Sequence, residues 1–82
     1  MAIKSMTDAN ACRGYRIRAG VAPETMAAIL GITKQTYYRI ENGQRVCSPP
    51  EMMAFSRACC LNMREFNEVF FQNELPLDSG KF

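Results

Sequence analysis

The side chains best suited to chemistry lie in one short stretch, GITKQTYYRIENG, which runs from residue 31 to residue 43. Its polar residues can donate or accept hydrogen bonds, and they are Lys34, Gln35, Thr36, Tyr38 and Arg39. The chain has no His, no glycine loop of the kind that cradles phosphate, and no pair of carboxylates placed as acid and base. The chemistry that this stretch indicates is therefore hydrogen bonding to a surface, and an enzyme is poorly supported.

The charge is unevenly distributed along the 82 residues, although the net charge of +2 is mild. Residues 13–45 contain six Lys or Arg and two Asp or Glu, whereas residues 48–82 contain three and five. The basic part contains the polar stretch, as expected of a surface that binds a polyanion.

Short helices must position these side chains, because Pro and Gly divide the chain into five helical segments and no alternating strand pattern is present. We expect these helices at roughly residues 8–19, 23–30, 33–41, 49–60 and 62–70. In the third helix Tyr37 and Ile40 are three residues apart and should face the core, so that Lys34, Gln35, Tyr38 and Arg39 face outward. Thr7 is the expected cap of the first helix, and Gly20 and Gly31 should end the first two in the left-handed conformation. Ser48 and Glu51 form an S-x-x-E capping box, which is the clearest helix start in the chain.

The four cysteines, which are Cys12, Cys47, Cys59 and Cys60, lack the paired spacing of a zinc site. We expect them to be small buried thiols in a reducing compartment, with no bound metal. The sequence shows neither an apolar run long enough to span a bilayer nor a secretory leader. These features predict a cytoplasmic protein without membrane contact.

The segment PETMAAILGITKQTYYRIENG resembles the helix-turn-helix of the Cro and phage-repressor family, the xenobiotic-response-element type of bacterial regulators. The likeness extends from about Cys12 to Phe66, and its most specific part is LGITKQTYYRIENG. It implies an all-α, compact five-helix lambda-repressor-like domain whose second and third helices form the helix-turn-helix. The expected organisation is an N-terminal arm at 1–7, the DNA-binding domain at 8–72 and a C-terminal tail at 73–82. Cys60 departs from the family, which prefers Gly after the fourth helix.

The resemblance implies that the third helix enters the major groove of double-stranded DNA, where each base pair shows a distinct pattern of donors and acceptors. The residues expected to read bases are Lys34, Gln35, Thr36, Tyr38 and Arg39. The residues expected to hold phosphates are Arg18, Thr33, Asn42, Gln44 and Arg45. Arg16 and Glu41 occupy the positions where this family places a largely buried Arg–Glu pair. No cofactor is implied.

Two functions remain open at this point. The first is a sequence-specific transcriptional regulator, such as a repressor or Cro-like protein of a phage or mobile element, which binds a pseudo-palindromic operator as a homodimer. Phe70 and Phe71 are the candidate dimer contacts, because exposed they would form a sticky patch. The alternative is a DNA-binding antitoxin or protein-docking module whose C-terminal segment, with Leu75 and Leu77, binds a partner protein.

Overall fold

The computed structural model describes residues 7–72, and this part of the chain folds into five helices. They are α1 (Ala9–Ala19), α2 (Pro23–Leu30), α3 (Lys34–Glu41), α4 (Pro49–Cys59) and α5 (Met63–Phe71). The expected all-α, five-helix fold is confirmed. The N-terminal arm, apart from Thr7, and the C-terminal tail with Leu75 and Leu77 lie outside the described residues.

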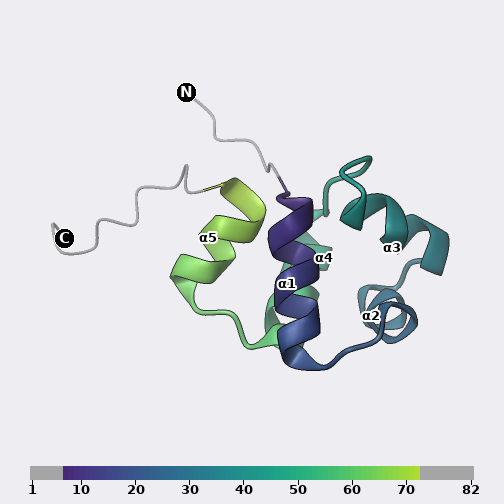
Figure 1. The fold of residues 1–82 in the computed structure, drawn as a ribbon, viewed down its shortest axis with the longest axis horizontal. Coiled ribbons are helices and arrows are strands. Elements are labelled where there is room, and N and C mark those ends of the chain that lie inside the picture. The colour runs from purple at the N-terminus through teal and green to yellow at the C-terminus, as the bar shows by residue number, and fades with distance from the viewer. Residues whose placement is uncertain (1–6, 73–82) are drawn as a thin grey trace, which may run out of the picture.

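α1 is the central helix of the arrangement. It lies between α5 on one side and the α2–α3 pair on the other (Figure 1), and it contacts α3, α4 and α5. α2 in turn packs against both α3 and α4. Each helix therefore buries one face, and α3 stays at the edge of the molecule.

The start of α1 differs from the sequence-based expectation. Asp8, and not Thr7, caps the helix, because the Asp8 carboxylate accepts a hydrogen bond from the Ala11 amide at 3.1 Å. Thr7 has another partner, since its hydroxyl accepts the amide hydrogen of Cys47 at 3.0 Å. The prediction of Thr7 as the cap is wrong because a contact 40 residues away along the chain recruits its side chain.

The other expected helix ends are confirmed. Gly20 and Gly31 take φ values of 73° and 75° as left-handed caps of α1 and α2. Ser48 and Glu51 form the full capping box of α4, in which each side chain accepts the other residue's amide hydrogen. These local signals fix where the helices begin and end, and so they fix the length of the turn between α2 and α3.

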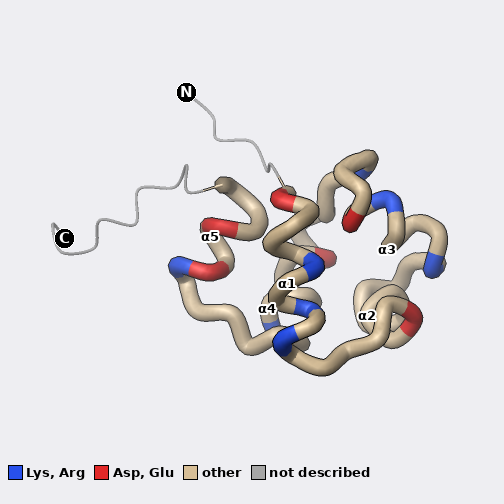
Figure 2. The backbone as a smooth tube through the Cα atoms, viewed as in Figure 1, with Lys and Arg blue, Asp and Glu red and all other residues tan. Residues whose placement is uncertain are grey.

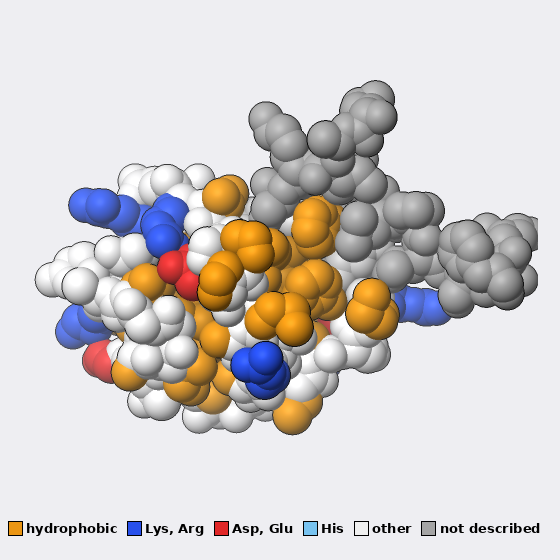
Figure 3. Space-filling view, turned by 180° about the vertical axis from the view of Figure 1, so that it is seen from behind, with side chains coloured by type: hydrophobic (Ala, Val, Ile, Leu, Met, Phe, Trp, Pro, Cys, Tyr) orange, Lys and Arg blue, Asp and Glu red, His pale blue; other side chains and the backbone are white. Residues whose placement is uncertain are grey.

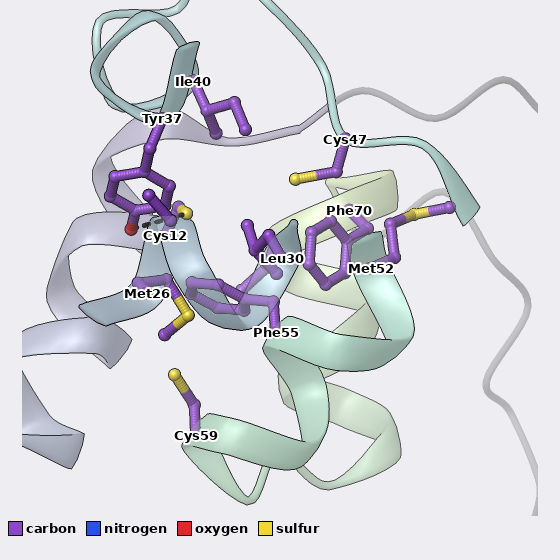
Figure 4. Close-up of a cluster of buried hydrophobic side chains, with 12 residues drawn as sticks. Cys12, Met26, Leu30, Tyr37, Ile40, Cys47, Met52, Phe55, Cys59 and Phe70 are labelled. Atoms are coloured by element: carbon purple, nitrogen blue, oxygen red, sulfur yellow. Dashed lines mark hydrogen bonds between the residues drawn. The ribbon is translucent and has the colours of Figure 1, made fainter. Parts of the chain in front are cut away.

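The core is built from aromatic and aliphatic side chains, and the labelled part of it is drawn in Figure 4. Phe70 is fully buried and packs edge-on against Phe55, with 5.7 Å between ring centroids. The expectation that Phe70 contacts a second copy is therefore wrong, because α5 turns this side chain into the core of its own chain. Phe71 is only partly buried and stays a candidate contact.

Within residues 7–72, no helix has the length and the apolar character that crossing a membrane requires.

Replacing Cys60 by Gly should stabilise the fold. Cys60 ends α4 in the left-handed region with φ 54° and ψ 48°. This conformation costs an L-residue with a Cβ roughly 1–2 kcal/mol, whereas Gly adopts it freely but loses more backbone entropy on folding. We expect Cys60→Gly to raise the free energy of unfolding by about 1 kcal/mol in urea denaturation. Cys60→Ala is the control, because it removes the thiol and keeps the strain. A Gly variant that is no more stable than the Ala variant would contradict this account.

Candidate nucleic-acid interface

α2 and α3 form a helix-turn-helix with a tight connection. At the end of α2, the amides of Gly31 and Ile32 donate to the carbonyl oxygens of Ala28 and Ala27 at 3.1 and 3.0 Å. Thr33 then begins α3 at once, and its hydroxyl accepts the amide hydrogen of Thr36 at 3.1 Å. The chain therefore turns from one helix to the next without a loop that could change their relative orientation.

α3 has one buried and one exposed face. Tyr37, Ile40 and Glu41 are buried. The expected base-reading side chains Lys34, Gln35, Tyr38 and Arg39 are exposed, and Thr36 is half-buried. The sequence-based assignment of inward and outward residues is confirmed, and contact of the outward residues with bases stays a prediction.

A polar network joins the buried face of α3 to α1. The Arg16 guanidinium donates to the Glu41 carboxylate, with 2.6 Å between Nε and Oε2, and so does the Tyr37 hydroxyl at 2.6 Å. Arg16 also donates to the Val21 carbonyl at 2.8 Å, and Arg13 lies 3.6 Å from Glu41. Burial raises the pKa of the Glu41 carboxyl, but the hydrogen bonds from Arg16 and Tyr37 outweigh it and hold that pKa below its usual range. The expected Arg16–Glu41 pair is confirmed.

Two of the expected phosphate-binding side chains have carboxylate partners within the chain. Arg45 forms a two-pronged pair with Glu51, with both nitrogens 2.9 Å from the carboxylate oxygens. Arg18 donates to Glu65 on α5 at 2.8 and 3.2 Å, and its guanidinium lies 4.6 Å from the centre of the Tyr15 ring. Arg18 therefore joins α1 to α5, and a phosphate would have to compete with a carboxylate for either arginine.

The remaining candidates lie at the two ends of α3. Thr33 precedes the helix, Asn42 and Gln44 follow it, and all three are exposed. Figure 2 shows basic residues along α1 and α3 and acidic residues on α5. On α3, Lys34 lies 3.9 Å from the exposed Glu24, and within residues 7–72 Arg39 forms no ion pair. Arg39 is thus the cation of this helix that is most available to an anion.

Comparison with known proteins agrees with this geometry. A family described as "Helix-turn-helix domain" matches residues 12–68. The chain belongs to this helix-turn-helix family. The helix-turn-helix protein is accordingly a DNA-binding regulator, and its family is not one of enzymes.

The helix-turn-helix protein is also similar to a solved structure. It is similar to the crystal structure of the restriction-modification controller protein C.AhdI from Aeromonas hydrophila, with a TM-score of 0.61 and 26% sequence identity. The match covers 71% of this chain and 88% of that chain. No curated protein sequence matches.

The cysteines of the helix-turn-helix protein are free thiols, and three of them are buried. The expectation of a buried thiol is wrong for Cys60, because this residue ends α4 in the left-handed conformation and its side chain is exposed. Burial raises the pKa of Cys12 and of Cys47 to about 12, and that of Cys59 to about 11. In the part of the chain that the structure describes, no three His, Cys, Asp or Glu side chains gather as metal ligands. The absence of a metal site stays an expectation.

Sequence reasoning missed the part that Tyr37 plays in the polar network. The sequence predicts Tyr37 in the core, and the side chain is buried there, but the sequence analysis gives its hydroxyl no hydrogen-bond partner. The spacing of Tyr37 and Glu41, four residues apart on one helix, was the available signal, since side chains at this spacing meet on one face.

Proposed function

We propose that the protein is a sequence-specific transcriptional regulator that reads the major groove with α3 and binds its operator as a homodimer. Regulators of this kind include the repressors and Cro-like proteins of phages and mobile elements and the controllers of restriction-modification systems. The similarity to a controller protein supports the second group as much as the sequence resemblance supports the first.

The observation that carries this proposal is the division of α3 into two faces. Its inner face is held by buried contacts of Tyr37, Ile40 and Glu41. Its outer face presents side chains whose donors and acceptors match base edges, above all Gln35, which can pair with adenine, and Lys34, which can donate to guanine. A helix that is rigidly mounted and chemically varied on its outer face suits sequence reading.

Exposed apolar side chains support a homodimer. Val46, Met53 and Met63 are each at least half exposed, at 52%, 50% and 66%. Figure 3 shows hydrophobic side chains gathered on the surface that is turned away in Figure 1. Because one recognition helix reads only a few base pairs, a second copy would supply the remaining specificity.

Selection of bound sequences from a random pool of DNA duplexes tests the proposal. We expect a pseudo-palindrome whose half-sites lie roughly 34–36 Å apart from centre to centre, or one helical turn. Sedimentation of the complex should show two chains on each site. The control is a variant with Lys34, Gln35 and Arg39 all replaced by Ala, which should enrich no sequence. Enrichment of an asymmetric site by a single chain would contradict the homodimer, and no enrichment at all would contradict sequence reading.

A further inference from the structure

Tyr37 places a hydroxyl group inside the apolar core. The side chain is fully buried, and Figure 4 shows its ring pointing among the core side chains with the hydroxyl toward Cys12. The oxygen lies 3.8 Å from the Cys12 sulfur and donates to Glu41 at 2.6 Å. Burial of a hydroxyl is unfavourable without a partner, so these contacts explain how the core tolerates it.

Tyr37 also lies between two candidate base-reading residues in the sequence. Thr36 precedes it and Tyr38 follows it, and both are expected to contact DNA. Since successive residues of an α-helix are 100° apart, given 3.6 residues per turn, the direction of the Tyr37 side chain sets the directions of its neighbours around the axis of α3.

The Tyr37–Glu41 bond is internal to α3, because both residues lie on that helix, and the link to α1 is made by Arg16. The Glu41 oxygen that accepts from Tyr37 is also the one that accepts from Arg16 Nε, and Arg16 continues to the Val21 carbonyl at the start of the turn before α2. One continuous set of hydrogen bonds therefore ties α3 to α1 and to the segment that leads into α2.

We infer that Tyr37 is a positioning residue for sequence recognition: its hydroxyl orients the Glu41 carboxylate for Arg16 of α1, and the Arg16–Glu41 bond then fixes the rotation of α3 about its own axis. This inference rests on the proposed function, and it deepens it by assigning part of the specificity to a residue that touches no DNA. Apolar packing has no directional preference, so the contacts of Ile40 alone tolerate a small rotation of the helix. A hydrogen bond weakens steeply when its angle departs from linearity, so the Arg16–Glu41 bond between α1 and α3 opposes such a rotation. The Tyr37 hydroxyl keeps the carboxylate oriented for that bond.

The chain contains a matched control for this inference. Tyr15 on α1 donates to Glu68 on α5, also at 2.6 Å. Tyr15→Phe and Tyr37→Phe each remove one hydroxyl from a Tyr–Glu hydrogen bond and leave the ring in place. The first bond joins α1 to α5, whereas the second lies within α3 and orients the carboxylate that Arg16 binds.

The experiment compares the wild-type protein with these two variants on two duplexes, the sequence selected from the random pool and a scrambled sequence. The quantity compared is the ratio of the two affinities, measured at temperatures equally far below the melting temperature of each protein. We expect Tyr37→Phe to lower this ratio by roughly 2- to 30-fold, the range over which residues without ligand contact modulate binding. Its affinity for the scrambled duplex should be unchanged, and Tyr15→Phe should keep the wild-type ratio.

The outcomes separate this inference from the proposed function. A purely structural role for Tyr37 would leave the ratio unchanged once the melting temperatures are matched, and that result would overturn the inference. An equal loss of the ratio in both variants would overturn it too. A wild-type protein that does not distinguish the two duplexes would overturn the proposed function itself.

Discussion

Glu41→Ala should lower the free energy of unfolding by about 3–5 kcal/mol, the usual cost of removing one partner from a buried ion pair. The Glu41 side chain is 4% exposed and that of Arg16 is 12% exposed, so the guanidinium that remains would be largely cut off from water. The Tyr37 hydroxyl would lose its acceptor as well. Because a small domain is stable by only about 5–15 kcal/mol, this variant should be close to unfolding.

Thermal denaturation measures this effect, with Arg45→Ala as the control. The Arg45 side chain is 32% exposed, and removing it leaves Glu51 still bonded to the Ser48 amide. Glu51 is only 10% exposed, but it keeps this hydrogen bond and its lost partner is the more exposed arginine, so breaking the pair should cost less than breaking Arg16–Glu41. Since 1 kcal/mol shifts the melting temperature of a domain of this size by about 4–8 °C, Glu41→Ala should melt at least about 12 °C below the wild type. Equal melting temperatures for the two variants would show that the Arg16–Glu41 pair stabilises the fold no more than the Arg45–Glu51 pair does.

The same pair should make the fold sensitive to acid. The pKa of Glu41 is lower in the folded protein than in the unfolded chain, so the carboxylate stabilises the fold above the unfolded pKa of about 4.3. This contribution is lost as the pH falls through the lower, folded pKa. Glu41→Gln keeps an acceptor but cannot titrate, and it should therefore show a flatter loss of stability in acid than the wild type.

Gln35→Ala should weaken binding to the preferred DNA sequence by about 1–3 kcal/mol and change binding to random DNA little. Gln35 is exposed in the first turn of α3, where its amide can pair with both polar groups of an adenine edge. Loss of one such pair removes discrimination at one base position. Affinity measurements on the selected duplex and on duplexes changed at single positions would locate that position.

Arg45→Ala provides the contrast, since Arg45 lies beyond α3 and is expected to contact the sugar–phosphate backbone. It should weaken binding to selected and random duplexes alike and reduce the slope of log affinity against log salt by about 1. The existing pair with Glu51 would offset part of this contribution, because DNA must compete for the guanidinium. If Gln35→Ala weakened both duplexes equally while Arg45→Ala relaxed the base preference, α3 would be presenting a different face to DNA.

Much of the fold could be predicted because its signals are local. Gly20 and Gly31 end helices in a conformation that favours Gly, and Ser48 with Glu51 begins a helix through contacts three residues apart. The inward direction of Tyr37 and Ile40 follows from their spacing on one short helix. The family resemblance added the expectation of the Arg16–Glu41 pair, which spans 25 residues and has no local signal.

Other features of the fold and of the candidate site could not be predicted, because they depend on contacts between segments that are far apart in the sequence. Arg18 and Glu65 are 47 residues apart, and no periodicity in the sequence brings them together. Thr7 and Asp8 are equally good caps by type, and the Cys47 amide decides between them. Phe70 and Phe71 are both apolar, so only the packing of α5 shows which of them completes the core.

The cysteines have a practical consequence for experiments on this protein. Alkylating reagents attack the thiolate, and burial together with raised pKa values keeps Cys12, Cys47 and Cys59 protonated and inaccessible at neutral pH. Cys60 is the exposed thiol, and it lies at the end of α4 rather than on α3. A maleimide fluorophore would therefore attach at one position of the native chain, and binding to DNA could be followed by the anisotropy of this single label without engineering a cysteine or altering the recognition helix.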